Sequence, residues 1–381
     1  DVAEVYHRPI PKELAGNPCW RQSWVVRVSS GLSWIVFKVG RKTVHEIHET
    51  TSNVATFRTF GYSASHFMSG KQLFLNSVGR LRSGWRLLIF ILVYIALLIG
   101  FGLIGRVVYA IALRFSPSVQ PGPFLQDVVF RGMLLAAALI AGFVCTRLLE
   151  GLPLRALGVW FHSRWSRDFL VGSAIGVVSL ALATLIATIG GGLRFSISGR
   201  ELLFQVIQTL VFTAVLFIIA ALAEEALLRG YPLQTMTRAG LFGLGAITTS
   251  VAFAALHMDN PNFQLGIAFF NLVIAGIWFA IAYWRTRSLW FPLGIHWAWN
   301  WALGSLFGLP VSGLTDIAPH PILRGVDLGP SWLTGGNYGV EGGIAGTVAL
   351  IISTIFVWRT RWVNASDEML KLTSTENSAS T

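Results

Sequence analysis

The chain is built around long apolar segments, and these limit it to folds that lie in a membrane. Of its 381 residues, 54% are hydrophobic and 12% are charged, whereas soluble domains carry roughly 25% charged residues. A helix needs about 20 apolar residues to cross a bilayer. Segments near this length are 87–105, 128–148, 169–189, 204–223, 241–257, 263–284, 289–309 and 343–358. We therefore predict an all-α polytopic membrane helix bundle with about eight transmembrane helices.

The flanks of these segments predict the orientation of the bundle. With the N-terminus in the cytoplasm, Lys and Arg on the inner flanks outnumber those on the outer flanks by fourteen to six. This bias follows the positive-inside rule and predicts that both termini are cytoplasmic. The net charge of +11 would suggest a nucleic-acid partner in a soluble chain. In a membrane protein the excess of Lys and Arg is interpreted as charge on the loops that sets the topology. The expected partner is therefore the lipid bilayer, and no nucleic acid is expected.

The parts outside the apolar segments are polar. Residues 1–80 are interpreted as an N-terminal extension that is disordered or lies upstream of the true start at Met68, with a small cytoplasmic subdomain as the alternative. A transmembrane domain is expected over 84–360. Its Gly- and Pro-rich loop 310–342 is expected to be irregular and to lie on the outer side. The Ser- and Thr-rich segment 363–381 is predicted to be a disordered tail.

Two further signals in the sequence are weaker. Cys19 and Cys145 provide no disulfide framework and no metal-binding spacing, and Cys145 is expected to serve only in packing. Gly172 and Gly176 have the Gly-x-x-x-Gly spacing that permits close packing of helices.

The first polar motif within the apolar segments is Glu224-Glu225-Ala226-Leu227-Leu228-Arg229. Glu225 and Arg229 are four residues apart, acid before base, which is the favourable order for an ion pair on one helix face. Glu224 points roughly 100° away from Glu225 and has no local partner. A carboxylate of this kind at the edge of an apolar environment is a candidate general base. The alternative is an ion pair at the membrane edge beside a solvated Glu.

The second motif ends the apolar run 241–256 at His257. Phe253 lies four residues earlier on the same helix face, so its ring is expected to separate the imidazole from lipid. Asp259 follows two residues later and is expected to orient a ring nitrogen. A structural histidine at a helix end is the alternative.

The third motif is His296-Trp297-Ala298-Trp299-Asn300. The i, i+4 spacing places the imidazole of His296 and the amide of Asn300 on one helix face. Together they could donate two hydrogen bonds to one oxygen, as an oxyanion hole does. The alternative is hydrogen bonding between packed helices, which is common in membrane bundles.

The ordered set of motifs resembles one known family. Glu-Glu-x-x-x-Arg, Phe-x-x-x-His and His-x-x-x-Asn on successive apolar segments resemble the CAAX-protease and bacteriocin-processing family, also called the abortive-infection family, of intramembrane proteases. The resemblance covers about residues 84–309 and extends more loosely to 343–358. All three motifs are complete.

The resemblance implies a role for each of these residues. Glu224 would activate a water molecule, and His257 would help to hold it. His296 and Asn300 would stabilise the oxyanion, while Glu225 and Arg229 would form a supporting pair. The family has been described both as metalloproteases and as metal-independent glutamate proteases. Glu224, His257 and His296 are also a possible zinc ligand set, so the cofactor is either a divalent metal such as zinc or none.

The resemblance also implies the kind of substrate and location. The expected function is an endopeptidase that cleaves membrane-associated peptides or protein C-termini, as CAAX prenyl proteases do. Bacterial relatives are associated with bacteriocin processing or immunity, and a bacterial plasma membrane is the expected location. The alternatives are a non-catalytic membrane scaffold or immunity protein and, third, a proton-coupled transporter, which would usually show inverted repeats that this sequence lacks.

One feature of the hydropathy pattern argues against a shared site. Glu224 falls near the inner end of its apolar segment and His257 near the outer end of the next, which in full spans would separate them by ~30 Å. The two can meet if the helix bearing Glu224 extends to Arg229 and the short segment 241–257 ends in mid-membrane. A site formed in this way would line a polar cavity in the bundle.

Overall fold

The computed structural model describes residues 5–6, 23–27, 34–38, 73–76, 79–116, 121–197 and 203–373. The chain divides into two units, Asp1–His66 and Phe67–Thr381. In the first, β1 (Val5–Tyr6), β2 (Ser23–Arg27) and β3 (Trp34–Lys38) form an antiparallel sheet in the order β1-β2-β3. The predicted start at Met68 and most of the predicted extension 1–80 lie outside the described residues.

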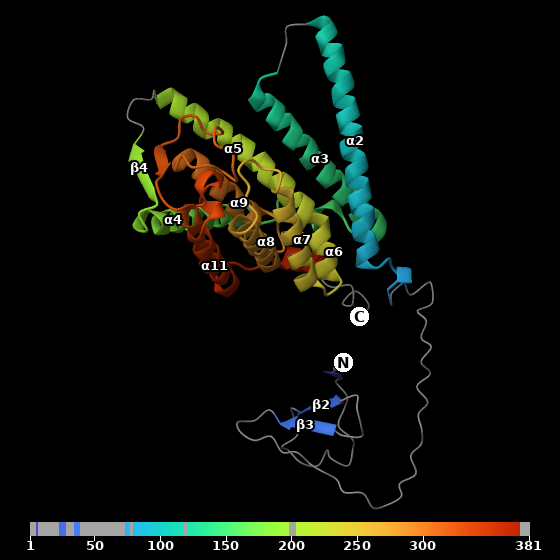
Figure 1. Ribbon diagram of the computed structural model, residues 1–381. Coiled ribbons are helices and arrows are strands. Elements are labelled where there is room, and N and C mark those ends of the chain that lie inside the picture. The colour runs from blue at the N-terminus through green and yellow to red at the C-terminus, as the bar shows by residue number, and fades with distance from the viewer. Residues whose placement is uncertain are drawn as a thin grey trace, which may run out of the picture. The chain divides into compact units, whose positions relative to one another are not determined.

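The second unit has a helix in each of the segments predicted to be apolar spans (Figure 1). They are α2 (Ser83–Phe115), α3 (Pro123–Glu150), α4 (Trp165–Ile189), α5 (Leu203–Glu225), α7 (Phe242–Leu256), α8 (Ile267–Thr286), α9 (Trp290–Trp301) and α11 (Ile344–Arg359). Within the described ranges, five helices are long and apolar enough to cross a membrane, and α7, α9 and α11 are shorter. The all-α membrane bundle is confirmed, while eight crossings and cytoplasmic termini stay predictions.

Helices α2 and α3 form a pair beside the rest of the bundle (Figure 1). A buried polar cluster fixes one end of the pair. Glu150 on α3 accepts a hydrogen bond of 2.5 Å from Thr235 Oγ1, lies 3.5 Å from Arg86 Nη1 on α2, and pairs with Arg238. Carboxylate and guanidinium groups are rarely buried unless they are paired in this way. Much of the outer surface of α2 is apolar, with Leu92 58% exposed, as expected for a lipid-facing helix.

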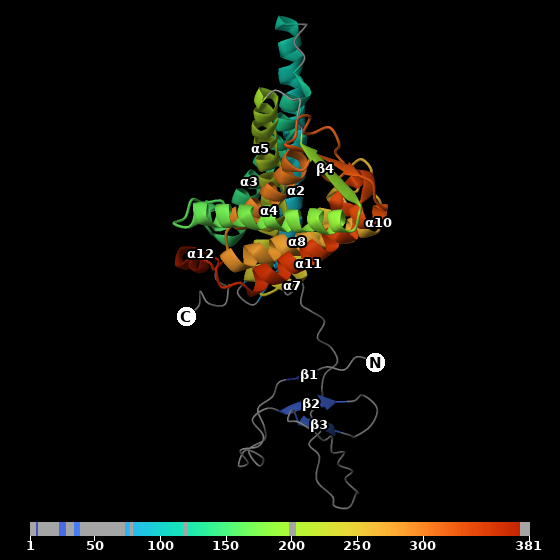
Figure 2. The same cartoon turned by 90° about the vertical axis from the view of Figure 1, so that its left-hand side faces the viewer.

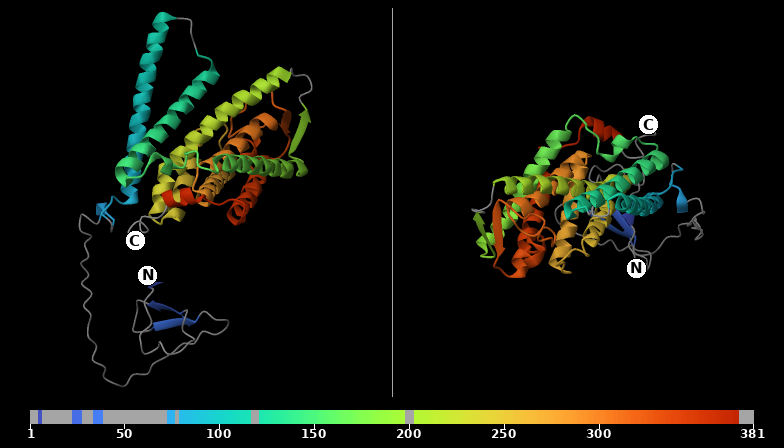
Figure 3. Two further views of the ribbon diagram at one scale, coloured as in Figure 1. Left: turned by 180° about the vertical axis from the view of Figure 1, so that it is seen from behind. Right: turned by 90° about the horizontal axis from the view of Figure 1, so that it is seen from above.

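Helix α5 runs between the α2–α3 pair and the remaining helices, as the view from behind shows (Figure 3). On the far side of the bundle, α11 packs against both α4 and α8 (Figure 2). The core between these helices contains large buried side chains such as Trp278, Phe279 and Phe291. The helix that carries Glu224 is therefore central rather than peripheral.

Helices α4 and α9 are in close backbone contact. A Cβ atom added to Gly172 or to Gly176 would lie 2.4 Å from the carbonyl oxygen of Phe291 or of Ile295, respectively. A Cβ on Gly294 of α9 would in turn lie 2.2 Å from the carbonyl oxygen of Phe169. The close packing expected from the Gly-x-x-x-Gly spacing is thus present, and it fixes the position of the helix that bears His296.

The loop predicted to be irregular contains regular structure. β5 (Leu323–Asp327) pairs antiparallel with β4 (Leu193–Ile197), and a short helix α10 (Ser331–Thr334) follows. Two 3₁₀ turns, η6 (Gly336–Tyr338) and η7 (Val340–Gly342), then lead into α11. The prediction of wholly irregular structure over 310–342 is corrected here, because pairing with β4 satisfies part of the loop backbone.

The polar C-terminal segment also contains a helix. α12 covers Asp367–Leu372, and the Ser366 side chain accepts a hydrogen bond from the Met369 backbone nitrogen at its start. Met369 is buried. The predicted disordered tail 363–381 is therefore corrected for this part, since an N-cap and one buried apolar residue hold a helical turn, and 374–381 lie outside the described residues.

Candidate active site

Glu224 lies inside a continuous helical segment rather than at its end. After Glu225, α5 continues through a π-helical stretch, η4 (Ala226–Gly230), into α6 (Tyr231–Arg238). The following helix α7 has only 15 residues and ends at Leu256. His257, at the C-terminus of α7, thereby comes to the level of Glu224. The separation of a full span suggested by hydropathy is wrong, because the helix does not end at its charged residues.

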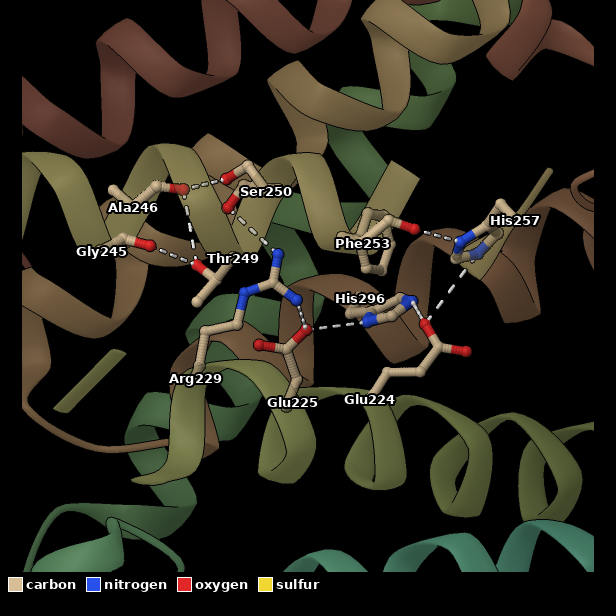
Figure 4. A network of polar contacts seen from close by, with 11 residues as sticks. Glu224, Glu225, Arg229, Gly245, Ala246, Thr249, Ser250, Phe253, His257 and His296 are labelled. Carbon is tan, nitrogen blue, oxygen red and sulfur yellow. Dashed lines mark hydrogen bonds and ion pairs between the residues drawn. The ribbon is translucent and has the colours of Figure 1, made fainter. Parts of the chain in front are cut away.

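The carboxylate of Glu224 faces two imidazole rings (Figure 4). Its Oε2 atom lies 3.6 Å from His296 Nε2 and 4.0 Å from His257 Nε2. This oxygen is buried and accepts no hydrogen bond, although the Glu224 side chain as a whole is 27% exposed. Both distances are longer than a normal hydrogen bond. They are short enough for one water molecule to contact the carboxylate and a ring nitrogen at the same time. Three motif residues from α5, α7 and α9 thus converge on one point.

Glu225 forms the ion pair that its spacing predicts. Its Oε1 atom accepts a hydrogen bond of 3.1 Å from Arg229 Nη1, and both side chains are fully buried. The same oxygen lies 3.0 Å from His296 Nδ1. Because an ionised carboxylate only accepts hydrogen bonds, the Nδ1 atom of His296 must carry a proton. Glu225 therefore fixes the orientation of the His296 ring.

Arg229 is held by more than its carboxylate partner. Its Nη2 atom donates to the Gly276 carbonyl oxygen at 3.1 Å. Its guanidinium carbon also lies 4.9 Å from the centre of the Phe253 ring and 5.1 Å from that of Phe279. A buried guanidinium gains from such ring faces because little solvent competes for it. The charge is thereby stabilised on three sides within the apolar core.

His257 is oriented by the backbone and not by Asp259. Its Nδ1 atom lies 2.8 Å from the carbonyl oxygen of Phe253. A carbonyl oxygen only accepts, so Nδ1 carries a proton, and Nε2 in the neutral ring keeps a lone pair towards Glu224. The Phe253 ring lies 4.6 Å from the imidazole, centre to centre, as expected. The expected role of Asp259 is wrong, because the helix end offers a nearer acceptor for the ring.

Aromatic rings enclose His296. The Phe279 ring stacks on the imidazole at 4.7 Å with an interplanar angle of 16°, and the Phe253 ring meets it edge-on at 5.7 Å. The His296 side chain is only 5% exposed. Such enclosure keeps bulk water from the ring and strengthens its interactions with charged groups.

Asn300 lies on the same side of α9 as His296, and both line one pocket. The other lining residues are Phe253, His257, Asn271, Leu272, Ala275, Trp278, Phe279, Trp299, Ser312, Glu341 and Leu350. The sequence motifs gave no indication of three of the polar ones, Asn271, Ser312 and Glu341. Two of these come from the loop between α9 and α11, where no periodic pattern relates a residue to the site.

The possible zinc ligand set is not formed by the side chains as they lie. Zinc holds nitrogen and oxygen donors at about 2.0–2.2 Å, so two donors on one tetrahedral ion lie about 3.4 Å apart. The separation of 4.0 Å between Glu224 Oε2 and His257 Nε2 is longer. Over the described part of the chain, no group of three or more His, Cys, Asp and Glu side chains is arranged to hold a metal ion. The zinc assignment stays a prediction from the resemblance.

A second grouping of Ser, His and Asp lies away from this site. His162 Nε2 is 2.9 Å from Ser288 Oγ and 3.6 Å from Asp168 Oδ2. The backbone nitrogen of Arg164 donates to His162 Nδ1, so in the neutral ring Nε2 carries the proton and donates to the serine. A catalytic base needs the reverse arrangement. Since Ser288 is also fully buried, this grouping joins the segments before α4 and α9 structurally.

Comparison with known families agrees with the geometry. Residues 206–302 match the family model described as type II CAAX prenyl endopeptidase Rce1-like. The matched segment includes Glu224, Glu225, Arg229, His257, His296 and Asn300. Among curated proteins, no sequence matches the chain. The match confirms the family resemblance seen in the motifs, and at the level of the family it indicates an intramembrane endopeptidase.

Proposed function

Since the segment that bears the motifs matches the family model described as type II CAAX prenyl endopeptidase Rce1-like, we propose that this protein hydrolyses peptide bonds of membrane-associated peptides or protein C-termini with a water activated by Glu224. One observation carries the proposal. Glu224 Oε2 is buried, accepts no hydrogen bond, and lies 3.6 and 4.0 Å from two imidazole nitrogens. A water in this position could contact the carboxylate and a ring nitrogen at once, which is the geometry that a general base requires.

In the first step, the carboxylate of Glu224 takes a proton from the water while its oxygen attacks the carbonyl carbon. The Nε2 lone pair of His257 accepts a hydrogen bond from the second hydrogen of the water, which stays on the attacking oxygen, because Nδ1 is committed to the Phe253 carbonyl. Glu224 then returns its proton to the leaving amine as the carbon–nitrogen bond breaks. One water is consumed, and a carboxyl group and an amine are produced.

The negative charge on the carbonyl oxygen is stabilised from α9. As an imidazolium, His296 donates from Nδ1 to Glu225 and from Nε2 towards the reacting oxygen. The Asn300 amide on the same helix face supplies a second donor. Removing one such donor typically costs about 10²–10³ in kcat, so both contributions are measurable.

Glu225 and Arg229 act as positioning residues in this scheme. Glu225 holds the His296 ring through Nδ1, and Arg229 balances the charge of Glu225 inside the core. A carboxylate that orients a catalytic imidazole in this way also fixes which ring nitrogen faces the substrate. Neither residue would contact the substrate itself.

The surroundings of the site support a substrate that arrives through the membrane. The catalytic side chains lie among helices with extensive exposed apolar surface, such as α2 and α5. A lipid-modified peptide or a membrane-bound C-terminus would already be concentrated there. We place the protein in a plasma membrane, that of a bacterium, with no requirement for nucleic acid.

The proposal is tested with purified protein in lipid nanodiscs and a quenched fluorescent peptide that carries a farnesylated cysteine. Wild-type protein should cleave it, and Glu224→Gln should lower kcat/KM by about 10²–10⁴, the usual contribution of a general base. Glu368→Gln on α12, remote from the motifs, is the matched control and should cleave normally. If wild type and Glu224→Gln behave alike, a scaffold function is favoured and the hydrolytic proposal fails.

A further inference from the structure

The pocket beside the histidines is lined by residues of α7, α8, α9 and α11, by His257 and by the loop between α9 and α11. Its polar lining residues include His257, His296, Asn300, Ser312 and Glu341. Glu224 is not among its lining residues. The pocket therefore adjoins the point where Glu224 meets the two imidazole rings.

The size of the pocket restricts what it can contain. Its cavity volume is about 30 Å³, and a cavity needs about 10–15 Å³ of this kind to hold one water. It thus has room for about two waters and is too small for a large substrate side chain. An apolar cavity of this size would stay dry, whereas one with two to four polar partners for each water would be filled.

The polar wall of the pocket that Glu341, Ser312 and Asn271 form is held by hydrogen bonds. Glu341 accepts hydrogen bonds from Trp299 Nε1 at 2.9 Å and from Ser312 N and Oγ at 2.6 and 2.8 Å. Asn271 donates to the carbonyl oxygens of Glu341 and Gly343 at 2.8 and 2.9 Å. These hydrogen bonds connect the loop after α9 to α8 and to α9 and hold the polar wall in a fixed position.

Hydrogen-bonding capacity remains in this wall after these contacts. An ionised carboxylate has about four acceptor sites, and the structure uses three at Glu341. Ser312 Oγ donates to Glu341 and retains its own acceptor sites. The amide of Asn300 forms no hydrogen bond within the described residues. These groups supply the partners that ordered waters need.

We propose that this pocket is a water-holding chamber that resupplies the nucleophile to the site. The proposal rests on the hydrolytic function above, in which each peptide bond cleaved consumes one water: its hydroxyl joins the carbonyl carbon and its remaining hydrogen goes to the leaving nitrogen. Waters held in a polar pocket next to the histidines can replace the one consumed without crossing apolar parts of the bundle. The hydrogen-bonded side chains of Glu341 and Ser312 form part of the chamber wall. Asn300, the proposed oxyanion donor, also lines the chamber.

The chamber is tested first by radiolytic hydroxyl-radical labelling of wild-type protein in nanodiscs, which oxidises buried side chains next to bound water. Phe279 lines the pocket and Phe217 does not, and both are 4% exposed. Phe279 should be oxidised several times faster than Phe217. Equal, slow oxidation of both would show a dry pocket and overturn the proposal.

A matched pair of variants tests the supply of water. Ala275 lines the pocket and Ala252 does not, although both are partly buried and packed on the same core. Ala275→Leu should slow labelling of Phe279 and lower kcat about tenfold, or 1.4 kcal/mol, with KM nearly unchanged, whereas Ala252→Leu should change neither. Normal kcat in a folded Ala275→Leu protein would refute the role in supply, and a raised KM with normal kcat would identify a substrate subsite.

Failure of the hydrolytic function would be recognised separately. If the wild-type protein cleaves no peptide but Phe279 is still oxidised rapidly, the chamber exists and the proposed activity is wrong. If Glu224-dependent cleavage is observed and Phe279 is protected, the activity stands and the chamber is wrong.

Discussion

The buried pair of Glu225 and Arg229 provides the sharpest quantitative prediction. Both side chains are fully buried, and they share the pair with His296 Nδ1. Arg229→Met removes the cation and leaves the carboxylate of Glu225 buried beside a single imidazole. Breaking a buried pair in this way costs about 3–5 kcal/mol. We expect Arg229→Met to lower the free energy of unfolding by that amount.

The double variant separates the cost of an unpaired charge from the loss of packing. Glu225→Gln/Arg229→Met keeps side chains of similar size and removes both charges, and Gln can still accept from His296. It should be more stable than Arg229→Met alone, with an interaction energy of about 0.5–3 kcal/mol between the two sites.

The assay is reversible unfolding of the wild-type protein, Glu225→Gln, Arg229→Met and the double variant in mixed detergent micelles, followed by tryptophan fluorescence. Unfolding of Phe279→Leu, measured in the same way, tests whether the aromatic ring beside the Arg229 guanidinium contributes to stability. If the double variant lost as much stability as the two single variants together, Glu225 and Arg229 would act independently and would not form a coupled pair.

Further predictions concern helix packing, acid stability and the second imidazole. Gly172→Ala should destabilise the protein by about 1–3 kcal/mol, because its Cβ would lie 2.4 Å from a carbonyl oxygen of α9; thermal unfolding of Gly102→Ala, where nothing lies within 4 Å, is the control. Burial lowers the pKa of His162 from its ordinary value of 6.5, with Glu368 opposing and Arg164 adding to the effect. The unfolded chain then binds the proton more readily, so stability should fall as pH drops below about 6.5, and His162→Gln should flatten that part of the stability curve; an unchanged curve would count against it. His257→Phe should lower kcat in the peptide assay by about 10² or more without loss of folding, and normal turnover would exclude His257 from holding the water.

Part of the site could be predicted from sequence because it depends on helical spacing. Glu225 and Arg229 pair since residues four apart share a helix face. The spacing of Phe253 and His257 likewise predicted the ring contact that the structure shows. Local periodicity was sufficient in these cases because both partners lie on one helix.

Other parts could not be predicted because they depend on tertiary structure. Hydropathy ends a span at Glu224, yet the helix continues to Arg238 because the charged side chains find buried partners. The hydrogen-bond partner of His257 Nδ1 is the backbone carbonyl of Phe253. Every residue has a backbone carbonyl, so the sequence does not indicate which one the ring contacts. Glu341 and Ser312 reach the pocket through a loop fold that no periodic pattern encodes.

An experimental density map of the wild-type protein in lipid at neutral pH tests the proposed water site at Glu224 directly. We expect Glu224, His257 and His296 to converge and one ordered solvent molecule to lie about 3 Å from Glu224 Oε2 and from at least one ring nitrogen. A map in which Glu224 is turned away from both rings, or in which His257 lies a helix turn or more from it, would contradict the central claim.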